Sequence, residues 1–423
     1  MMSHRLLRPV RLAPLMKRLL PAATLAALLT GCMPARRDLP LVLYVAVSIQ
    51  DEGQLTSESA ASFRKRFQEL VRNFRRIHPN VLVQVALYQE KDLVQQIRLR
   101  DWAGLGPDLI LTGAEQANGL LQAGLVDPMP MDSQQRSNSS PALLQRVRNH
   151  RGQLAGQPLV VFPQLACYDR RAISTPPTTL GELLKNSAAG KEVGLAIDIR
   201  QLLWSAGDFN AMPGLFRASR GLAPSAAQRQ AIEAWLAWLQ RANSQQRFNF
   251  YPDQASLRDG LGKGALDWVS CNSAELNVLR QRMGPHLGVT VLPSGLSHAP
   301  TPISRLRVMA LGTNSSPVQR EMALALTRFS IGPLVQRSFT LENLSFLPSN
   351  PRVSVPVESS AALQAMVLSR EQGAEADTLL ADLHSEDARV QALQDQVMVP
   401  LVFGVLEPRS ATDLMISILR SSQ

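Results

Sequence analysis

The stretch LVLYVAVSIQ at residues 41–50, together with FRKRFQELVRNFRRIHPNVLVQVAL at residues 63–87, decides the fold class. Residues 41–47 form a continuous apolar run, which is typical of a strand buried on both faces of a parallel sheet. Between residues 63 and 77, apolar side chains recur at helical spacing among arginines, which predicts an amphipathic helix. The helix should end at His78, because a residue that precedes proline disfavours helical backbone angles. A second apolar run at 81–87 predicts a strand, so we expect a strand–helix–strand unit.

The same alternation continues along the chain. We expect strands at 109–111, 159–162, 193–197, 266–270 and 289–292, and helices at 92–100, 115–123, 179–184, 225–239 and 316–329. Thr179 with Glu182 and Ser225 with Gln228 match capping boxes, and Pro317 stands at the favoured first position of a helix. Strands that alternate with helices predict an α/β architecture.

The N-terminus carries a secretory signal. Residues 1–18 are basic, residues 19–29 are mostly apolar, and Leu29-Thr30-Gly31 precedes Cys32. A charged region, a short apolar region and a small residue before the cleavage site describe a signal peptide rather than a membrane span. The sequence around Cys32 resembles the bacterial lipobox. This resemblance implies a signal peptide at 1–31, a lipid on the Cys32 sulfur and a tether at 32–40, whereas the alternative is a plain signal peptide with an incidental cysteine.

Composition and charge exclude several classes of protein. Of the 423 residues, 45% are hydrophobic and 18% are charged, which is an ordinary globular composition. No apolar run after the N-terminus is long enough to cross a membrane. The net charge of +10 falls to +5 when the five basic residues of 1–31 are removed. Nucleic acid is therefore not an expected partner, because half of the positive net charge belongs to the signal segment and is lost when that segment is removed.

Cys167 and Cys271 are the other two cysteines of the chain. An exported protein can form a disulfide between them. Two cysteines so far apart in sequence cannot be paired from the sequence alone, and two small buried thiols are the alternative.

Several short motifs occur in an order that resembles one family. They are FRRIHPNVLV at 74–83, GPDLI at 106–110, LLQAGLVDP at 120–128, GQLAGQP at 152–158, PTTLGEL at 177–183, GVTVLP at 288–293 and FLP at 346–348. Each motif alone is weak, but their order covers nearly the whole chain after the signal. The chain resembles the extracellular solute-binding proteins of ABC importers, of the sugar-binding, maltose-binding-protein-like type.

This resemblance implies a periplasmic-binding-protein-like fold with two α/β lobes, three lobe-crossing segments and a ligand cleft. By analogy, the first lobe comprises 40–157 plus 300–347, and the second comprises 158–299 plus 348–423. The implied protein is a monomer without a cofactor, anchored by its lipid at the periplasmic face of a bacterial membrane. Its partners would be a small solute and ABC permease subunits.

Candidate ligand-binding residues follow from the ends of the predicted strands, where open α/β sheets bind ligands. The candidates are Ser48, Gln50, Asp51, Thr112, Glu115, Gln116, Trp204, Ser205, Asp208, Ser270, Asn272 and Arg307. For each polar residue the alternative is a helix cap or a solvated turn. Trp204, among serine, glycine and aspartate, is a candidate stacking platform, whereas Trp102, Trp235 and Trp238 are expected to serve packing.

Enzyme motifs are absent from the sequence. No H-E-x-x-H, G-x-S-x-G or P-loop pattern occurs, and the histidines show no paired metal spacing. The preferred hypothesis is therefore a receptor for a sugar or polyol. Aromatic content of only 5% and the pair Arg305 and Arg307 keep two alternatives open. These are a receptor for an anionic or phosphorylated solute, and an assembly lipoprotein that kept the fold without transport.

Overall fold

The computed structural model describes residues 40–49, 57–295, 297–383 and 387–421. Its strands are β1 Leu41–Ile49, β2 Val81–Gln89, β3 Leu109–Gly113, β4 Val126–Asp127, β5 Gln157–Asp169, β6 Val193–Ala196, β7 Phe248–Tyr251, β8 Trp268–Asn272, β9 Leu287–Thr290, β10 Ser304–Gly312 and β11 Leu347–Pro348. The helices of the first half are α2 Ser57–Ile77, α3 Glu90–Trp102, α4 Ala114–Gln122, α5 Ser133–Ser137, α6 Pro141–Arg146, α7 Leu180–Ala188, α8 Ile199–Leu202 and α9 Met212–Ser219. Those of the second half are α10 Ala226–Asn243, α11 Gln254–Gly262, α12 Leu276–Met283, α13 Pro317–Ser330, α14 Pro333–Asn343, α15 Ala361–Gln372, α16 Ala374–Leu383, α17 Asp387–Leu393, α18 Val399–Val402 and α19 Pro408–Arg420.

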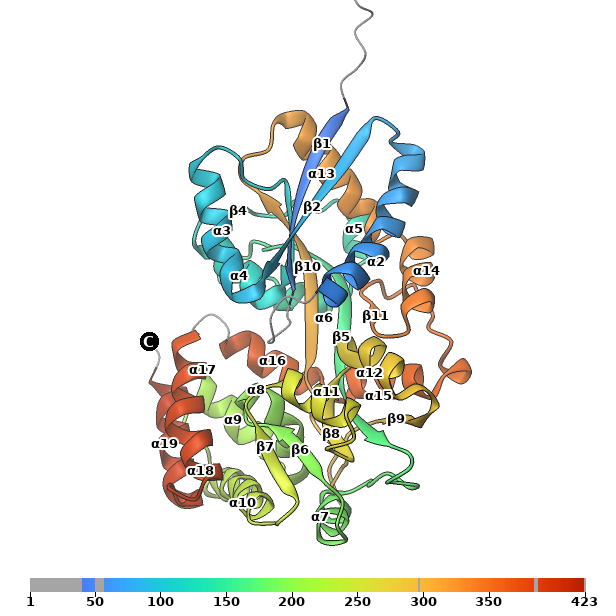
Figure 1. Ribbon diagram of the computed structural model, residues 1–423. Helices are drawn as coiled ribbons and strands as arrows, with labels where there is room; N and C mark the ends of the chain where they lie inside the picture. Colours follow the sequence, from blue (N-terminus) through green and yellow to red (C-terminus); the bar gives the residue numbers. More distant parts are fainter. Residues whose placement is uncertain (1–39, 50–56, 296, 384–386, 422–423) are drawn as a thin grey trace, which may run out of the picture.

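The strands form two groups that share β5 and β10. β1 lies between β2 and β3 with parallel pairing, and β10 joins this group antiparallel to β3. β6 lies between β7 and β8 with parallel pairing, and β8 is antiparallel to β5. In Figure 1, β5 and β10 run side by side from the upper group into the lower one.

The molecule therefore has two α/β lobes. We call the upper group of strands with α2–α6, α13 and α14 the first lobe, and the lower group with α7–α12 and α15–α19 the second lobe (Figure 1). The chain crosses between them in β5, in β10 and after β11. The predicted α/β class with three crossings is confirmed, while the exact residue boundaries of the lobes stay a prediction.

Local signals place the elements where the sequence predicts them. Thr179 and Ser225 form complete capping boxes with Glu182 and Gln228, as expected. Asp108 of the GPDLI motif is buried, and its carboxylate accepts hydrogen bonds from the Tyr44 amide at 2.8 Å and the Ser315 hydroxyl at 2.7 Å. This motif therefore ties the starts of β3 and α13 to β1.

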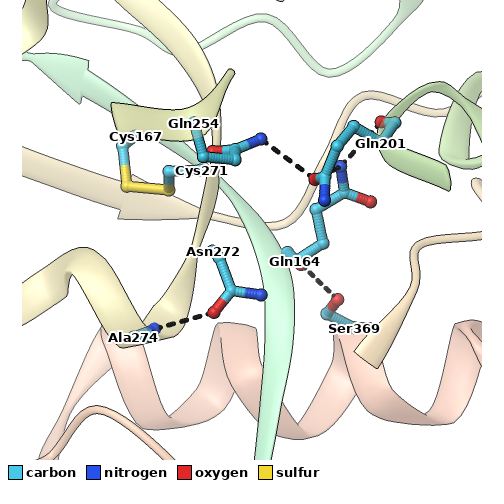
Figure 2. Close-up of a disulfide and its surroundings, with 8 residues drawn as sticks. All are labelled: Gln164, Cys167, Gln201, Gln254, Cys271, Asn272, Ala274 and Ser369. Atoms are coloured by element: carbon cyan, nitrogen blue, oxygen red, sulfur yellow. Dashed lines mark hydrogen bonds between the residues drawn. A yellow bond between two sulfur atoms is a disulfide. The ribbon is translucent and has the colours of Figure 1, made fainter. Parts of the chain in front are cut away.

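A disulfide joins Cys167 of β5 to Cys271 of β8, with 5.8 Å between the two Cα atoms (Figure 2). The sequence allowed either a disulfide or two buried free thiols at these positions. The structure has the disulfide. It lies within a register-matched antiparallel pair, where Leu165 faces Cys271 and Cys167 faces Val269. The bond therefore fastens the crossing strand to the second lobe.

Two predictions about tryptophans are tested by burial. Trp235 and Trp238 are buried in the core of the second lobe, as expected. Trp102 was expected to pack, but it is 90% exposed at the last residue of α3. The prediction was wrong because α3 ends there and presents its last turn to solvent. No helix of the described ranges has the length and apolar character that a membrane crossing needs.

Candidate functional site

A cavity of about 200 Å³ lies between the two lobes. It is bounded from the first lobe by the ends of β1 and β3 and by α2, and from the second lobe by α11 and α12. The crossing strands β5 and β10 pass between these walls. Ligands of open α/β sheets bind beyond the carboxyl ends of strands, so this cavity is the candidate functional site.

Apolar side chains dominate the lining. Twelve of the eighteen lining residues are apolar, and five of the twelve are phenylalanines; tryptophan and tyrosine do not contribute. The apolar lining consists of Ile49, Phe63, Phe67, Leu70, Leu111, Leu159, Val160, Phe162, Ala274, Val278, Phe339 and Phe346. The polar lining consists of Ser48, Arg258, Glu275, Asn277, Arg305 and Arg307.

Four of the predicted site residues form one directed chain of hydrogen bonds. Gln116 donates its side-chain NH₂ to the Glu90 carbonyl, and its oxygen accepts a hydrogen bond from the Thr112 hydroxyl. A hydroxyl has a single proton to donate, so Ser48 must be the donor in its 3.0 Å bond with Thr112. The Ser48 oxygen in turn accepts from Arg307 Nη1 at 3.1 Å. The chain holds Arg307 in place at the cavity wall.

Arg307 has only neutral hydrogen-bond partners among the described residues. Its Nη2 donates to the carbonyls of Ser48 at 2.6 Å and Leu111 at 2.9 Å, so three hydrogen bonds use three of its five N–H groups. Burial lowers the pKa of the Arg307 guanidinium to about 10, and the neighbouring Arg305 charge acts in the same direction. The Glu90 and Glu115 carboxylates oppose this shift without bonding to the guanidinium. Arg307 therefore stays protonated at neutral pH, and no described residue is bonded to it as a counter-ion.

Arg305 lines the same cavity two residues earlier on β10. Side chains two residues apart in a strand point to the same face. Arg305 faces Phe162 and Arg307 faces Val160 across the pair with β5, and all four line the cavity. Within the described ranges Arg305 makes no hydrogen bond or close ion pair, and its charge acts at longer range on Asp198, which Arg200 already binds.

The other polar lining residues have side-chain partners inside the protein. Arg258 forms ion pairs with Glu275 and Asp259, each at 3.1 Å. The Asn277 side chain donates to the Ser345 hydroxyl and accepts from Arg280. The lining thus carries three arginines against one glutamate, so its formal charge is positive.

Five predicted site residues belong to the second lobe and do not line this cavity. Trp204 is fully buried between the rings of Trp238 and Trp268, with centroid distances of 6.5 and 6.3 Å, which corrects its prediction as a stacking platform. The Ser205 hydroxyl is also buried, where it accepts from the Trp235 indole N–H and donates to the Leu202 carbonyl. Both lie in the 3₁₀ helix at Leu203–Phe209.

Asp208 lines a separate cavity of about 420 Å³, together with Trp238 and His298. Burial raises the pKa of the Asp208 carboxyl to about 7. This cavity is lined by the second lobe alone, so it is not the cleft between the lobes.

Ser270 and Asn272 lie on β8 but do not line the cavity. Ser270 is fully buried, and Asn272 is 1% exposed. Asn272 accepts a hydrogen bond from the Ala274 amide at 2.9 Å, as Figure 2 shows, and donates to the Phe162 carbonyl at 3.2 Å. Its amide therefore caps the short helix that follows β8 and orients two lining segments instead of offering groups to a ligand.

Glu115 lies in a different polar cluster, which joins the lobes. Its carboxylate pairs with Arg146 at 3.2 Å, and Arg146 pairs with Asp377 of α16 at 3.1 Å. Asp377 also accepts from the Ser304 amide at 2.7 Å. Burial raises the pKa of Asp377 to about 6, although the Arg146 charge opposes the shift. Gln50, Asp51 and Cys32 lie outside the described residues.

The structure brings together Ser48, Thr112, Gln116 and Arg307 of the predicted set. It adds the phenylalanines, which the sequence assigned to packing or did not single out. Phe63, Phe67 and Leu70 follow helical spacing, and that pattern cannot separate a face turned to the core from one turned to a cavity. Among described residues, no cluster of three or more metal-binding side chains occurs.

The overall chain resembles solved solute-binding proteins. An ABC transporter solute-binding protein from Thermotoga lettingae, bound to α-D-tagatose, matches with a TM-score of 0.66 and 14% identity over 90% of this chain and 99% of that one. The GacH receptor of Streptomyces glaucescens, studied unliganded and with acarbose, matches with a TM-score of 0.68 and 14% identity over 90% and 100%. The maltodextrin-binding domain MalE from Bdellovibrio bacteriovorus, bound to maltotriose, matches with a TM-score of 0.64 and 17% identity over 90% and 98%.

No protein-family model matches the chain, and no curated protein matches it. At such low identities the solved structures show the fold, which is the periplasmic-binding-protein-like fold that the sequence predicts.

Proposed function

We propose that the protein is the substrate-binding component of an ABC import system, and that it captures a small solute by closing its two lobes. The observation that carries this proposal is the cavity whose walls come from both lobes. Two lobes joined by crossing strands can close over a ligand by hinge bending. The structural neighbours support the proposal, because they are sugar-bound proteins of the solute-binding kind.

The proposal includes the setting of the protein. A monomer anchored through Cys32 at the periplasmic face of the membrane would present its closed form to permease subunits. The role is binding without catalysis. An assembly lipoprotein with the same fold is the alternative, and it would neither close on a solute nor support uptake.

Two solute classes follow from different observations. The neighbours support a sugar or polyol, which is the prediction from resemblance. Arg305 and Arg307 at the cavity wall support the second candidate, an anionic solute.

Small-angle scattering tests the capture step on the chain from residue 33, which keeps every described element. The radius of gyration should fall when a binding solute is added. In the host, deletion of the gene should abolish uptake of that solute. Binding without contraction, or unchanged uptake in the deletion strain, would contradict the proposed function.

A further inference from the structure

The cavity between the lobes has the composition of a site for an amphiphilic anion. We propose that its ligand is an organic carboxylate with an apolar body, held by Arg305 and Arg307 at the carboxylate and by the phenylalanines along the body. This inference rests on the proposed function and names the solute class of the same cavity.

The apolar lining disfavours a sugar. Twelve apolar side chains would face the hydroxyl groups of a bound sugar, and a buried hydroxyl without a hydrogen bond is costly. Phe162, Phe346 and Phe339 lie in continuous contact, with ring centroids 5.6 and 4.8 Å apart, and Phe63 stacks on Phe67 of the same helix, α2. Ligand pockets of this type bind the apolar part of a ligand by burying its surface, and a few polar groups fix the orientation of the ligand.

The polar groups with capacity left for a ligand are cationic. Arg307 has two N–H groups without a described partner, and Arg305 has no bonded partner in the described ranges. Glu275, the one acidic lining residue, is 3.1 Å from Arg258. A desolvated cation without a bonded counter-ion favours binding of an anion, because the ligand then supplies the missing charge.

The two arginines fix the position of the carboxylate. They lie on one face of β10, beside Phe162 and Val160 of β5. Arg307 faces Gly113 of β3 on its other side, where the Glu90 and Glu115 carboxylates lie, so the ligand carboxylate belongs on the side of Arg305. A carboxylate bound there would leave its apolar body to extend toward α2, α12 and α14, where the phenylalanines and Val278 lie.

Calorimetry on the chain from residue 33 provides the test, with hexanoate, octanoate and decanoate as the ligands. The controls are octanamide, inorganic phosphate and maltotriose. Affinity should rise about fourfold for each added methylene, because each one transfers apolar surface from water. Octanamide should bind roughly tenfold or more weakly than octanoate, because it lacks the charge. Phosphate, which has no apolar body, should bind more weakly than every carboxylate.

Variants separate the two ends of the site. Arg305→Gln should weaken octanoate about tenfold to hundredfold, whereas Arg328→Gln, an exposed arginine of α13 outside the cavity, should leave it unchanged. Phe63→Gln should weaken decanoate more than hexanoate. Arg307→Gln repeats the charge test, and its melting temperature without ligand shows whether it folds.

Absence of carboxylate binding overturns the inference, and so does equal affinity for octanoate and octanamide. Maltotriose binding that contracts the molecule, with no carboxylate bound, also overturns it but leaves the proposed function standing. Carboxylate binding that depends on Arg305 and contracts the molecule supports both.

Discussion

Trp204 illustrates what a single residue reveals only in three dimensions. Its neighbours in sequence are serine, glycine and aspartate, and such a setting indicates an accessible aromatic ring. In space its neighbours are Trp238 and Trp268, and the side chain is fully buried. Trp235 and Trp238 were predicted correctly because they lie on a long helix with a clear period, whereas Trp204 lies in a short 3₁₀ segment without one.

Replacement of Trp204 by alanine should therefore destabilise the fold. Loss of a buried tryptophan costs about 3–5 kcal/mol, through lost burial and the cavity left behind. Denaturant unfolding measures this cost, with Trp102→Ala as a matched control on an exposed ring, where little change is expected. If the Trp204→Ala variant kept its stability but lost affinity for the solute, Trp204 would be a ligand-binding residue after all.

Asp208 should make the stability of the protein depend on pH. Burial raises the pKa of its carboxyl from 3.8 to about 7, so the folded state holds a proton that the unfolded chain releases near pH 4. The stabilising contribution is complete below pH 4 and is lost as pH rises toward about 7. Asp208→Asn should remove this dependence, so that the variant gains melting temperature relative to wild type at pH 8 but not at pH 4. Parallel melting curves of the two proteins over this pH range would contradict the assignment.

Proximity between predicted residues could be foreseen where one rule of position sufficed. Ser48 and Thr112 follow parallel strands at a shared edge, and Arg307 lies on the crossing strand beside them, so their meeting was predictable. The cavity walls could not be predicted from the sequence. Phe63, Phe162 and Phe346 come from distant parts of the chain and meet only when α2, β5 and the segment before β11 are assembled. The placement of Ser270 and Asn272 likewise depends on β5, which pairs with β8 at these residues although it lies far away in sequence.

At the scale of elements, the disulfide between β5 and β8 should contribute strongly to stability. It closes a chain segment with a sequence separation of 104, and restricting the unfolded chain over such a length is worth about 4–5 kcal/mol in the chain-entropy account. A Cys167→Ala/Cys271→Ala double variant should unfold at lower denaturant concentration than the oxidised protein. The reduced wild type should behave like the variant; if oxidised and reduced forms unfold alike, the bridge adds nothing.

The Arg146 cluster links α4, α6 and α16 across the two lobes. Removing one member of a buried ion pair leaves an uncompensated charge and costs about 3–5 kcal/mol. Asp377→Ala should show this loss in denaturant unfolding, because among the described residues Arg146 then keeps only Glu115 as an acidic partner. The exposed pair Glu69 and Arg72 offers a control, since Glu69→Ala should change stability by less than about 1 kcal/mol. Equal effects of the two variants would argue against a linking role for Asp377.

The elements themselves differ in how well the sequence predicts them. Capping boxes and apolar runs are local, so α7, α10, β1 and β2 were expected near their observed places. β10 was not expected as a strand from the sequence. Its two arginines interrupt the apolar pattern, and its pairing with β3 and β5 joins residues far apart in sequence.

At the scale of the whole molecule, the order of motifs predicted the two-lobed fold because that order follows the path of the chain between the lobes. The described chain begins at Pro40, just before β1, at the end of the first lobe remote from the second (Figure 1). A tether of residues 32–40 reaches at most about 30 Å when fully extended. A lipid on Cys32 would therefore hold the first lobe close to the membrane while leaving the lobes free to close.

Replacement of Cys32 by serine tests this arrangement. The variant should lose metabolic palmitate labelling and move from the membrane fraction to the soluble fraction, because the acyl chains are the expected means of attachment and a single chain binds only reversibly. The Cys167→Ala/Cys271→Ala variant controls for labelling at other cysteines and should remain labelled and membrane-bound. Labelling that persists without Cys32 would show that the anchor assignment is wrong. Loss of labelling with full retention in the membrane fraction would instead mean that a feature other than the lipid, such as an uncleaved signal segment or a surface of the folded protein, holds it there.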